Sequence, residues 1–144
     1  MTTIENYIRV IFDDVIKFHN ELEQSGNEIK TRIIDHGRIE AAVNAPFATL
    51  GGVDLYPSIF DKTAALWHGL ANDHGFEDGN KRTATHSMLC FLGVNDISLE
   101  YSQKELSDMA VLVGSGNSKI SRQEISDWIK KGLIKISFIT SCIK

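Results

Sequence analysis

Apolar residues recur at every third or fourth position over most of this chain, and that spacing restricts the fold more than any other feature. The first run places six apolar side chains on one helical face: Ile4, Ile8, Ile11, Val15, Phe18 and Leu22. The spacing matches the 3.6-residue turn of an α-helix and predicts a long amphipathic helix that ends at Gly26. A short helix is expected from about Arg38 to Val43, because Pro46 follows.

Residues 46–57, PFATLGGVDLYP, interrupt the helical pattern. Prolines bound this segment, and Gly51-Gly52 breaks it between apolar residues. We interpret it as a loop or a small hairpin that forms a flap over another part of the fold. Ser58 is a candidate N-cap for the next helix, whose buried stripe would be Phe60, Ala64, Trp67 and Leu70 or Ala71.

Helical patterns also dominate the second half of the chain. The segment KRTATHSMLCFLG predicts a helix that closes at Gly93, with four residues facing inward: Ala84, Met88, Phe91 and Leu92. Ser102–Glu105 and Ser121–Glu124 have the S-x-x-E pattern of a capping box, and Gly132 would end the last helix. Residues 133–144 fit either a strand or a docked extension. The expected fold is all-α, a compact bundle of about six helices, with one domain over 1–144.

Composition and charge limit the classes of function. A chain of 144 residues suits one core, and its net charge of −4 argues against a broad nucleic-acid surface. Cys90 and Cys142 are too far apart in sequence to suggest a disulfide framework or a metal motif, which favours a reduced, cytoplasmic setting. Asp13 and Asp14 lie where a signal peptide would be apolar, and no run approaches the roughly 18 apolar residues of a membrane span. We expect no membrane association.

The sequence HGFEDGNKR, from His74 to Arg82, separates two of the predicted helices. The second of these helices starts at Asn80, and a helix N-terminus offers unpaired N–H groups and partial positive charge to an anion such as phosphate. Gly79 permits a tight turn, and Lys81 next to Arg82 adds full positive charge.

An acid in such a place makes sense if Asp78 holds Mg²⁺ between its carboxylate and the phosphates. His74 is then a candidate general base for an incoming hydroxyl, and Phe76 would anchor the loop in the core. Each residue also has a simpler explanation, because Asp-Gly is a common turn, Asn80 a common N-cap and Lys81 an ordinary surface cation. Those explanations do not account for His74, Phe76 and the two adjacent cations occurring together. The combination therefore favours phosphoryl or nucleotidyl transfer.

HGFEDGNKR resembles the signature of the Fic/Doc family, H-x-F-x-[DE]-[GA]-N-[GK]-R. The likeness extends from roughly Ile33 to about Lys131 and is strongest over Ala45–Asn95. The resemblance implies a compact helical bundle that uses ATP and Mg²⁺. It implies that His74 is the general base and that Asp78 holds the metal.

Other roles that the resemblance implies concern the phosphates and the target. Asn80 and the backbone of Gly79–Lys81 would form an anion hole, and Lys81 and Arg82 would contact the nucleotide phosphates. Phe76 would be structural. The flap near Leu50–Leu55 would align a target polypeptide by backbone pairing.

Two positions distinguish branches of the family. Nucleotide-transferring members usually have glycine where this chain has Lys81, and a second arginine where it has Thr85. Both positions resemble the Doc branch, in which a kinase transfers the terminal phosphate of ATP to a threonine of elongation factor Tu and stops translation. The alternatives are a Fic-type nucleotidyltransferase that uses the same residues and a catalytically silent protein-binding module.

Control of such a toxin is expected from a second protein. The [ST]-x-x-x-E-[GN] pattern of the internal inhibitory helix found in some Fic proteins does not occur in this sequence. The resemblance therefore implies a type II toxin–antitoxin pair, in which a Phd-like antitoxin inserts an amphipathic helix beside the motif.

Overall fold

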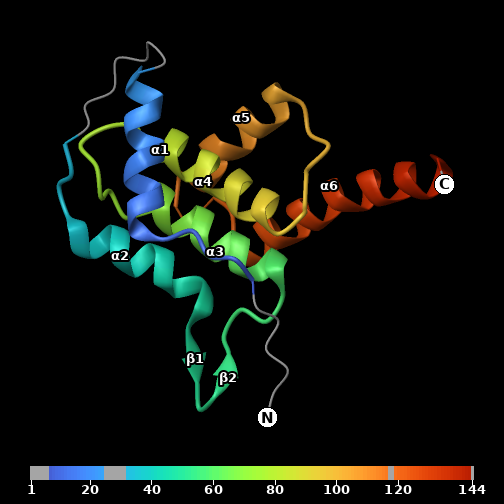
Figure 1. Ribbon diagram of the computed structural model, residues 1–144, viewed down its shortest axis with the longest axis horizontal. Helices are drawn as coiled ribbons and strands as arrows, with labels where there is room; N and C mark the ends of the chain where they lie inside the picture. The colour runs from blue at the N-terminus through green and yellow to red at the C-terminus, as the bar shows by residue number, and fades with distance from the viewer. Residues whose placement is uncertain (1–6, 25–31, 117–118, 144) are drawn as a thin grey trace.

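The structure is a computed structural model that describes residues 7–24, 32–116 and 119–143, with side chains described as far as Leu133 except at residues 23 and 24. It confirms an all-α fold with one small hairpin (Figure 1). The described elements are α1 (Phe12–Gln24), α2 (His36–Asn44), the 3₁₀ turn η1 (Ala45–Phe47), β1 (Thr49–Leu50), β2 (Val53–Asp54), α3 (Ile59–Asn72), α4 (Asn80–Val94), α5 (Gln103–Val113) and α6 (Arg122–Ile143).

Helix α3 is the centre of the core and contacts α2, α4, α5 and α6. Every residue from Lys62 to Ala71 is buried, because neighbouring helices cover all sides of this helix. Trp67 is completely buried at its middle. The inward faces predicted for α3 and α4 are confirmed, since Ala64, Leu70, Ala71, Ala84, Met88, Phe91 and Leu92 are all buried, and only Phe60 is partly exposed.

Three of the predicted helix starts, at Ser58, Ser102 and Ser121, are confirmed by their capping hydrogen bonds. The Ser58 hydroxyl accepts from the Asp61 N–H at 3.0 Å. Ser102 and Glu105 form a reciprocal capping box at 2.9 and 3.1 Å, and Ser121–Glu124 does the same at 3.0 and 3.1 Å. These bonds use N–H groups that a helix start otherwise leaves unpaired.

The first helix is shorter than predicted. It begins at Phe12, and residues 7–11 run alongside Asn95, whose side chain accepts from the Ile8 N–H at 2.9 Å and donates to the Ile8 carbonyl at 3.0 Å. This pairing holds the backbone at Ile8 out of a helix. Ile8 and Ile11 are consequently 59% and 52% exposed rather than buried, while Ile4 and Gly26 lie outside the described residues.

Of the three glycines predicted to end a helix, Gly26 lies outside the described residues, and neither Gly93 nor Gly132 ends one. Helix α4 continues through Gly93 to Val94 and is followed by Asn95 as its C-cap. Helix α6 continues through Gly132 to Ile143, so residues 133–143 are helical and not a strand. Gly132 is buried because the Tyr101 ring lies against it, and a Cβ atom there would be 2.5 Å from Tyr101 Cε2. Close packing, rather than helix termination, explains the absence of a side chain.

The segment that was expected to be a loop or a small hairpin is a hairpin. Thr49 pairs with Asp54 and Leu50 with Val53, and Gly51 and Gly52 both have positive φ, 58° and 81°. Its base is fixed by Lys62, a buried lysine that donates to the carbonyls of Pro46 and Tyr56 at 3.4 and 2.5 Å and to Asp54 Oδ2 at 3.3 Å.

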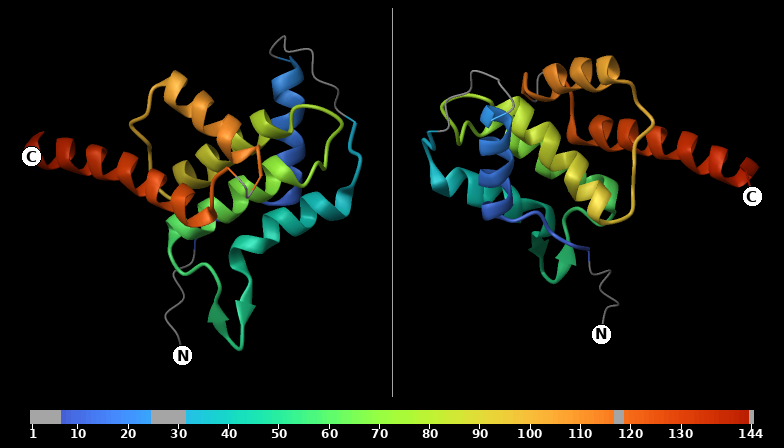
Figure 2. Two further views of the ribbon diagram at one scale, coloured as in Figure 1. Left: turned by 180° about the vertical axis from the view of Figure 1, so that it is seen from behind. Right: turned by 45° about the horizontal axis from the view of Figure 1, so that its top comes forward.

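The hairpin lies at the opposite end of α3 from the loop that carries the HGFEDGNKR motif, as all three ribbon views show (Figures 1 and 2). The 14 residues of α3 separate them, which at about 1.5 Å per residue is roughly 21 Å. The hairpin therefore does not adjoin the motif loop, and its role in aligning a target polypeptide stays a prediction. No helix within the described residues is long and apolar enough to cross a membrane.

Candidate active site

The motif loop, residues 73–79, connects α3 to α4 and is closed by Asn80. The Asn80 Oδ1 accepts from the Phe76 N–H at 3.1 Å, and its Nδ2 donates to the Phe76 carbonyl at 2.9 Å. The amide therefore pairs with Phe76 as another backbone strand would. Phe76 is buried, as predicted, with 3% of its surface exposed. Because the Asn80 side chain is used inside the loop, only its backbone N–H faces a phosphate site.

A second backbone segment fixes the loop from outside. Residues 32–35 run antiparallel to the loop, with a bridge between Ile33 and Phe76. The Gly75 carbonyl accepts from the N–H of Ile34 at 2.8 Å, and the Glu77 N–H donates to the Arg32 carbonyl at 2.9 Å. The loop between two helices is thus held like a short strand.

His74, the candidate base, follows the C-cap of α3 and is exposed. Its φ is 51°, in the left-handed region that non-glycine residues seldom occupy and that is common at functional sites. The bonds of Gly75 and Phe76 on one side and the end of α3 on the other hold the backbone in this conformation.

The start of α4 has the features of an anion site. Gly79 is its N-cap with φ 79° and offers no side-chain cap. The first backbone bond of the helix is from Thr83 N–H to the Gly79 carbonyl at 2.9 Å, so the N–H groups of Asn80, Lys81 and Arg82 make no hydrogen bond to the described residues. Three adjacent donors at a helix N-terminus suit phosphate oxygens.

Lys81 and Thr85 occupy the positions that separate the family branches. Both lie on α4, and Lys81 is exposed while its aliphatic stem packs against Gly114 at the end of α5. The Thr85 hydroxyl donates to the Lys81 carbonyl at 2.8 Å and accepts from Trp67 Nε1 at 3.1 Å. Thr85 therefore supplies no charge and is engaged within the helix and the core.

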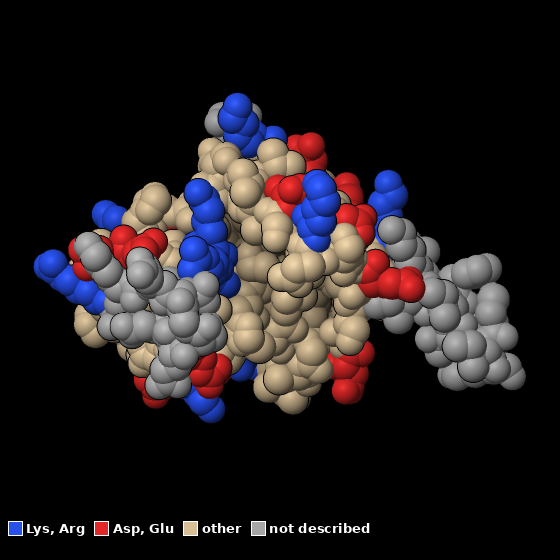
Figure 3. Space-filling model, turned by 90° about the horizontal axis from the view of Figure 1, so that it is seen from above, with Lys and Arg blue, Asp and Glu red and all other residues tan. Residues whose placement is uncertain are grey.

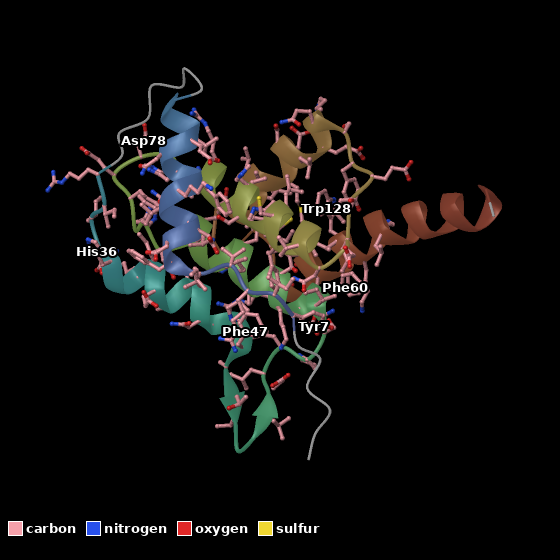
Figure 4. The ribbon with its side chains drawn as sticks, in the orientation of Figure 1. Tyr7, His36, Phe47, Phe60, Asp78 and Trp128 are labelled. Atoms are coloured by element: carbon pink, nitrogen blue, oxygen red, sulfur yellow. The ribbon has the colours of Figure 1, made fainter. Side chains whose placement is uncertain are left out.

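Asp78 is exposed beside this helix start (Figure 4), and its Oδ1 accepts from the Gly79 N–H at 2.8 Å. The described residues contain no cluster of three or more His, Cys, Asp or Glu that could hold a metal alone. A single exposed carboxylate next to unpaired N–H groups fits Mg²⁺, which is commonly held by one or two carboxylates plus substrate phosphates and water. The donor set is thus compatible with magnesium bound together with a nucleotide.

A groove opens beside Lys81 and Arg82, between α4 and α5, with a volume of about 400 Å³. Most of its lining is apolar and comes from three helices: Leu22, Leu89, Leu106, Ala110 and Val111. On the face seen from above in Figure 3, Lys and Arg side chains stand beside uncharged surface. The groove combines an apolar floor with a basic edge.

The carboxyl of Asp73 lies just before His74 at the end of α3. Burial raises the pKa of this carboxyl, and the positive charges of His68, Arg38 and Arg122 oppose that effect. Arg38 Nη1 also donates to the backbone carbonyl of Asp73 at 3.3 Å. This bond gives a partner to one of the carbonyl groups that the end of a helix leaves without one.

Comparison with known proteins gives a family model that matches residues 8–92 and describes the Fic/DOC family. The chain belongs to the Fic/DOC family. The match covers α1, the hairpin, α3 and most of α4, so it includes the whole motif loop.

Two curated proteins are similar to this Fic/DOC member. Toxin Doc of Mycolicibacterium smegmatis is 49% identical over 74 residues, which are 51% of this chain and 55% of that protein. The chain therefore spans little more than half the length of Toxin Doc. Protein kinase doc of Escherichia phage P1 is 31% identical over 97 residues, 67% of this chain and 74% of the phage protein.

His74 and Asp78 are exposed on the motif loop, and Lys81 and Arg82 are exposed in the first turn of α4. The structure also shows a residue that sequence reasoning missed. His19 on α1 is fully buried and contacts the loop at Asp78. A signal was present, since His19 falls four residues after Val15 on the apolar face of the first helix.

Proposed function

We propose that this chain is the toxin of a type II toxin–antitoxin pair and acts as a Mg²⁺- and ATP-dependent protein kinase. The observation that carries the proposal is the helix start at Gly79, where unpaired N–H groups adjoin Lys81 while Thr85 supplies no charge. The resemblance to Toxin Doc and to Protein kinase doc supports the same function. Residues 1–144 are proposed to form one domain, because buried residues from Val10 to Ile129 share a single core.

Lys81 favours transfer of the γ-phosphate over transfer of a nucleotide. Glycine at this position would leave space for the α-phosphate at the helix start, and an arginine at position 85 would hold the γ-phosphate farther along α4. In this chain position 81 is a lysine whose stem lies against Gly114, and position 85 is a threonine bonded to Trp67. The γ-phosphate would therefore lie at the helix start, where Lys81, Arg82 and the N–H groups stabilise its charge.

The residues of the chain supply the other parts of the reaction. His74 would accept the proton of a target hydroxyl, whose oxygen bonds to the γ-phosphorus as the bond to the bridging oxygen breaks and ADP leaves. Asp78 would hold Mg²⁺, which supplies positive charge to the phosphates when bound. The backbone N–H groups of Asn80, Lys81 and Arg82 would orient the transferred group.

The proposed target is a translation factor, with elongation factor Tu as the first candidate, and the proposed antitoxin is Phd-like. The groove between α4 and α5 is the proposed docking site of the antitoxin. Its apolar floor at Leu89 and Leu106 suits the apolar face of a helix, and its basic edge at Lys81 and Arg82 suits acidic side chains. A helix seated there would cover the phosphate site and block the kinase.

Expression in a bacterial host tests this function. We expect the wild-type chain to arrest protein synthesis and the Lys81→Ala variant to have little effect on it. The control variant Lys17→Ala, which changes an exposed lysine on α1, should remain toxic.

Co-expression with an adjacent antitoxin should restore growth and give a stoichiometric complex, which leucine-to-aspartate changes at Leu89 or Leu106 should weaken. Equal toxicity of wild type and Lys81→Ala would contradict the proposal, and no toxicity from either would favour the silent binding module.

A further inference from the structure

His19 is a buried histidine on α1 that reaches the motif loop. None of its surface is exposed, and its Nε2 lies 2.7 Å from the carbonyl oxygen of Asp78. A carbonyl oxygen only accepts, so Nε2 carries the proton and donates. The ring stacks on Phe76 with centroids 3.9 Å apart and planes 5° from parallel.

The hydrogen bond from His19 holds a part of the loop that the other hydrogen bonds to the loop do not reach. The pairing with residues 32–35 and the Asn80 amide hold Gly75, Phe76 and Glu77. Among the described residues, His19 makes the one hydrogen bond to the Asp78 carbonyl, which precedes the left-handed turn at Gly79.

The direction of this carbonyl determines the direction of the next N–H group. A trans peptide is planar, and its C=O and N–H point to opposite sides. Because the Asp78 carbonyl points inward to His19, the Gly79 N–H points outward, where Asp78 Oδ1 accepts from it at 2.8 Å. The orientation of one peptide therefore fixes the exposed carboxylate of Asp78 as well as the entry into α4.

Packing alone does not require a histidine at this position. A phenylalanine would stack on Phe76 and bury no polar atom, whereas the His19 Nδ1 is buried with no hydrogen-bond partner in the described part of the chain. Burial of an unpaired polar atom is unfavourable. The donor at Nε2 is the feature that histidine supplies here and phenylalanine does not.

We infer that His19 is a positioning residue for the candidate active site, which orients the Asp78–Gly79 peptide so that the Asp78 carboxylate and the first N–H groups of α4 face one ligand. The part of this inference that concerns Mg²⁺ rests on the proposed function. The part that concerns the loop does not.

The test compares His19→Phe, which keeps the ring and removes the donor, with His19→Gln, which keeps an amide donor. His36→Phe is the matched control, because His36 also stacks on an aromatic ring, Phe12, with centroids 5.6 Å apart, and it makes no hydrogen bond to the motif. Two measurements apply to each variant: amide hydrogen exchange at Gly79 and Thr83, whose N–H groups are bonded to Asp78 Oδ1 and to the Gly79 carbonyl, and Mg²⁺-dependent binding of a non-hydrolysable ATP analogue.

We expect His19→Phe to speed exchange at Gly79 and Thr83 and to weaken the Mg²⁺-dependent part of binding by about 10–100-fold, the usual effect of losing a group that orients a metal ligand. Binding without Mg²⁺ should change much less. His19→Gln and His36→Phe should resemble the wild type. Wild-type exchange and Mg²⁺ dependence in His19→Phe would overturn the inference.

The same design separates this inference from the proposed function. If the wild type binds no ATP analogue, the proposed function fails, and amide exchange at Gly79 and Thr83 alone decides the role of His19. If His19→Phe does not fold, His19→Gln decides, because faster exchange at Gly79 and Thr83 in that variant would show that a donor at this position does not hold the loop.

Discussion

At the scale of single residues, the motif contains side chains that build the loop and side chains that face solvent. Phe76 and Asn80 belong to the first kind, since one is buried and the other pairs with the loop backbone. His74, Asp78 and Lys81 belong to the second kind. Changes in the first group should unfold the loop, whereas changes in the second should remove chemistry and leave the fold intact.

His74→Ala tests the second group. We expect a loss of roughly 10²–10⁴-fold in the rate of transfer, the usual contribution of a general base, with little change in thermal stability because His74 is exposed. His36→Ala, a change of another exposed histidine, is the control for both measurements. An unchanged transfer rate in His74→Ala would remove this residue from the mechanism.

Gly114→Ala tests the placement of Lys81 without changing a charge. The φ of Gly114 is −77°, which alanine adopts readily, but a Cβ atom would collide with the Lys81 stem, including Cδ at 2.8 Å. The flexible lysine would move away, so we expect slower phosphate transfer at nearly unchanged stability. Transfer kinetics and thermal melting measure the two effects. A wild-type transfer rate in Gly114→Ala would show that the contact of Lys81 with Gly114 does not matter for the reaction.

At the scale of elements, two glycines inside helices should respond to alanine in opposite directions. Gly93 in α4 is exposed and a Cβ atom there would meet nothing within 4 Å, so Gly93→Ala should stabilise the protein by about 0.5–1 kcal/mol. Gly132→Ala should destabilise it by about 1–3 kcal/mol, because the added methyl group overpacks the site against the Tyr101 ring. Denaturant unfolding measures both, and stabilisation by Gly132→Ala would contradict the described contact between α6 and Tyr101.

The end of α3 gives a prediction about pH. Because burial raises the pKa of Asp73 in the folded state, this carboxyl favours folding below its unfolded-state pKa, and the contribution is lost as pH rises through the folded-state pKa. Asp73→Asn should therefore melt higher than the wild type at about pH 7, and the difference should shrink near pH 3, below the usual carboxylate pKa. A melting-temperature difference between Asp73→Asn and the wild type that grows as the pH falls would contradict the raised pKa of Asp73.

At the scale of the whole molecule, local patterns predicted the elements better than their ends. Capping boxes and apolar stripes identified α3, α4, α5 and the start of α6, because these signals lie within one element. The errors came from contacts between distant segments: Asn95 pairs with Ile8 and shortens the first helix, and Tyr101 explains the glycine that was expected to end α6. Helical spacing contains no information about such partners.

The candidate site shows the same division. The motif from His74 to Arg82 was visible in the sequence because its residues are consecutive. The pairing with residues 32–35 and the bond from His19 were not visible, because they come from elsewhere in the chain. The sequence also did not show that the hairpin lies at the end of α3 away from the motif loop.

The central claim is that the helix start at Gly79 and Lys81 directs the γ-phosphate of ATP to a protein hydroxyl. The most direct measurement incubates the purified chain and purified elongation factor Tu with Mg²⁺ and ATP labelled at the γ-phosphate in one reaction and at the α-phosphate in the other. We predict label on the factor from γ-labelled ATP alone, and its loss with His74→Ala and Lys81→Ala. Label transferred from α-labelled ATP would contradict the account, because the same residues would then transfer a nucleotide.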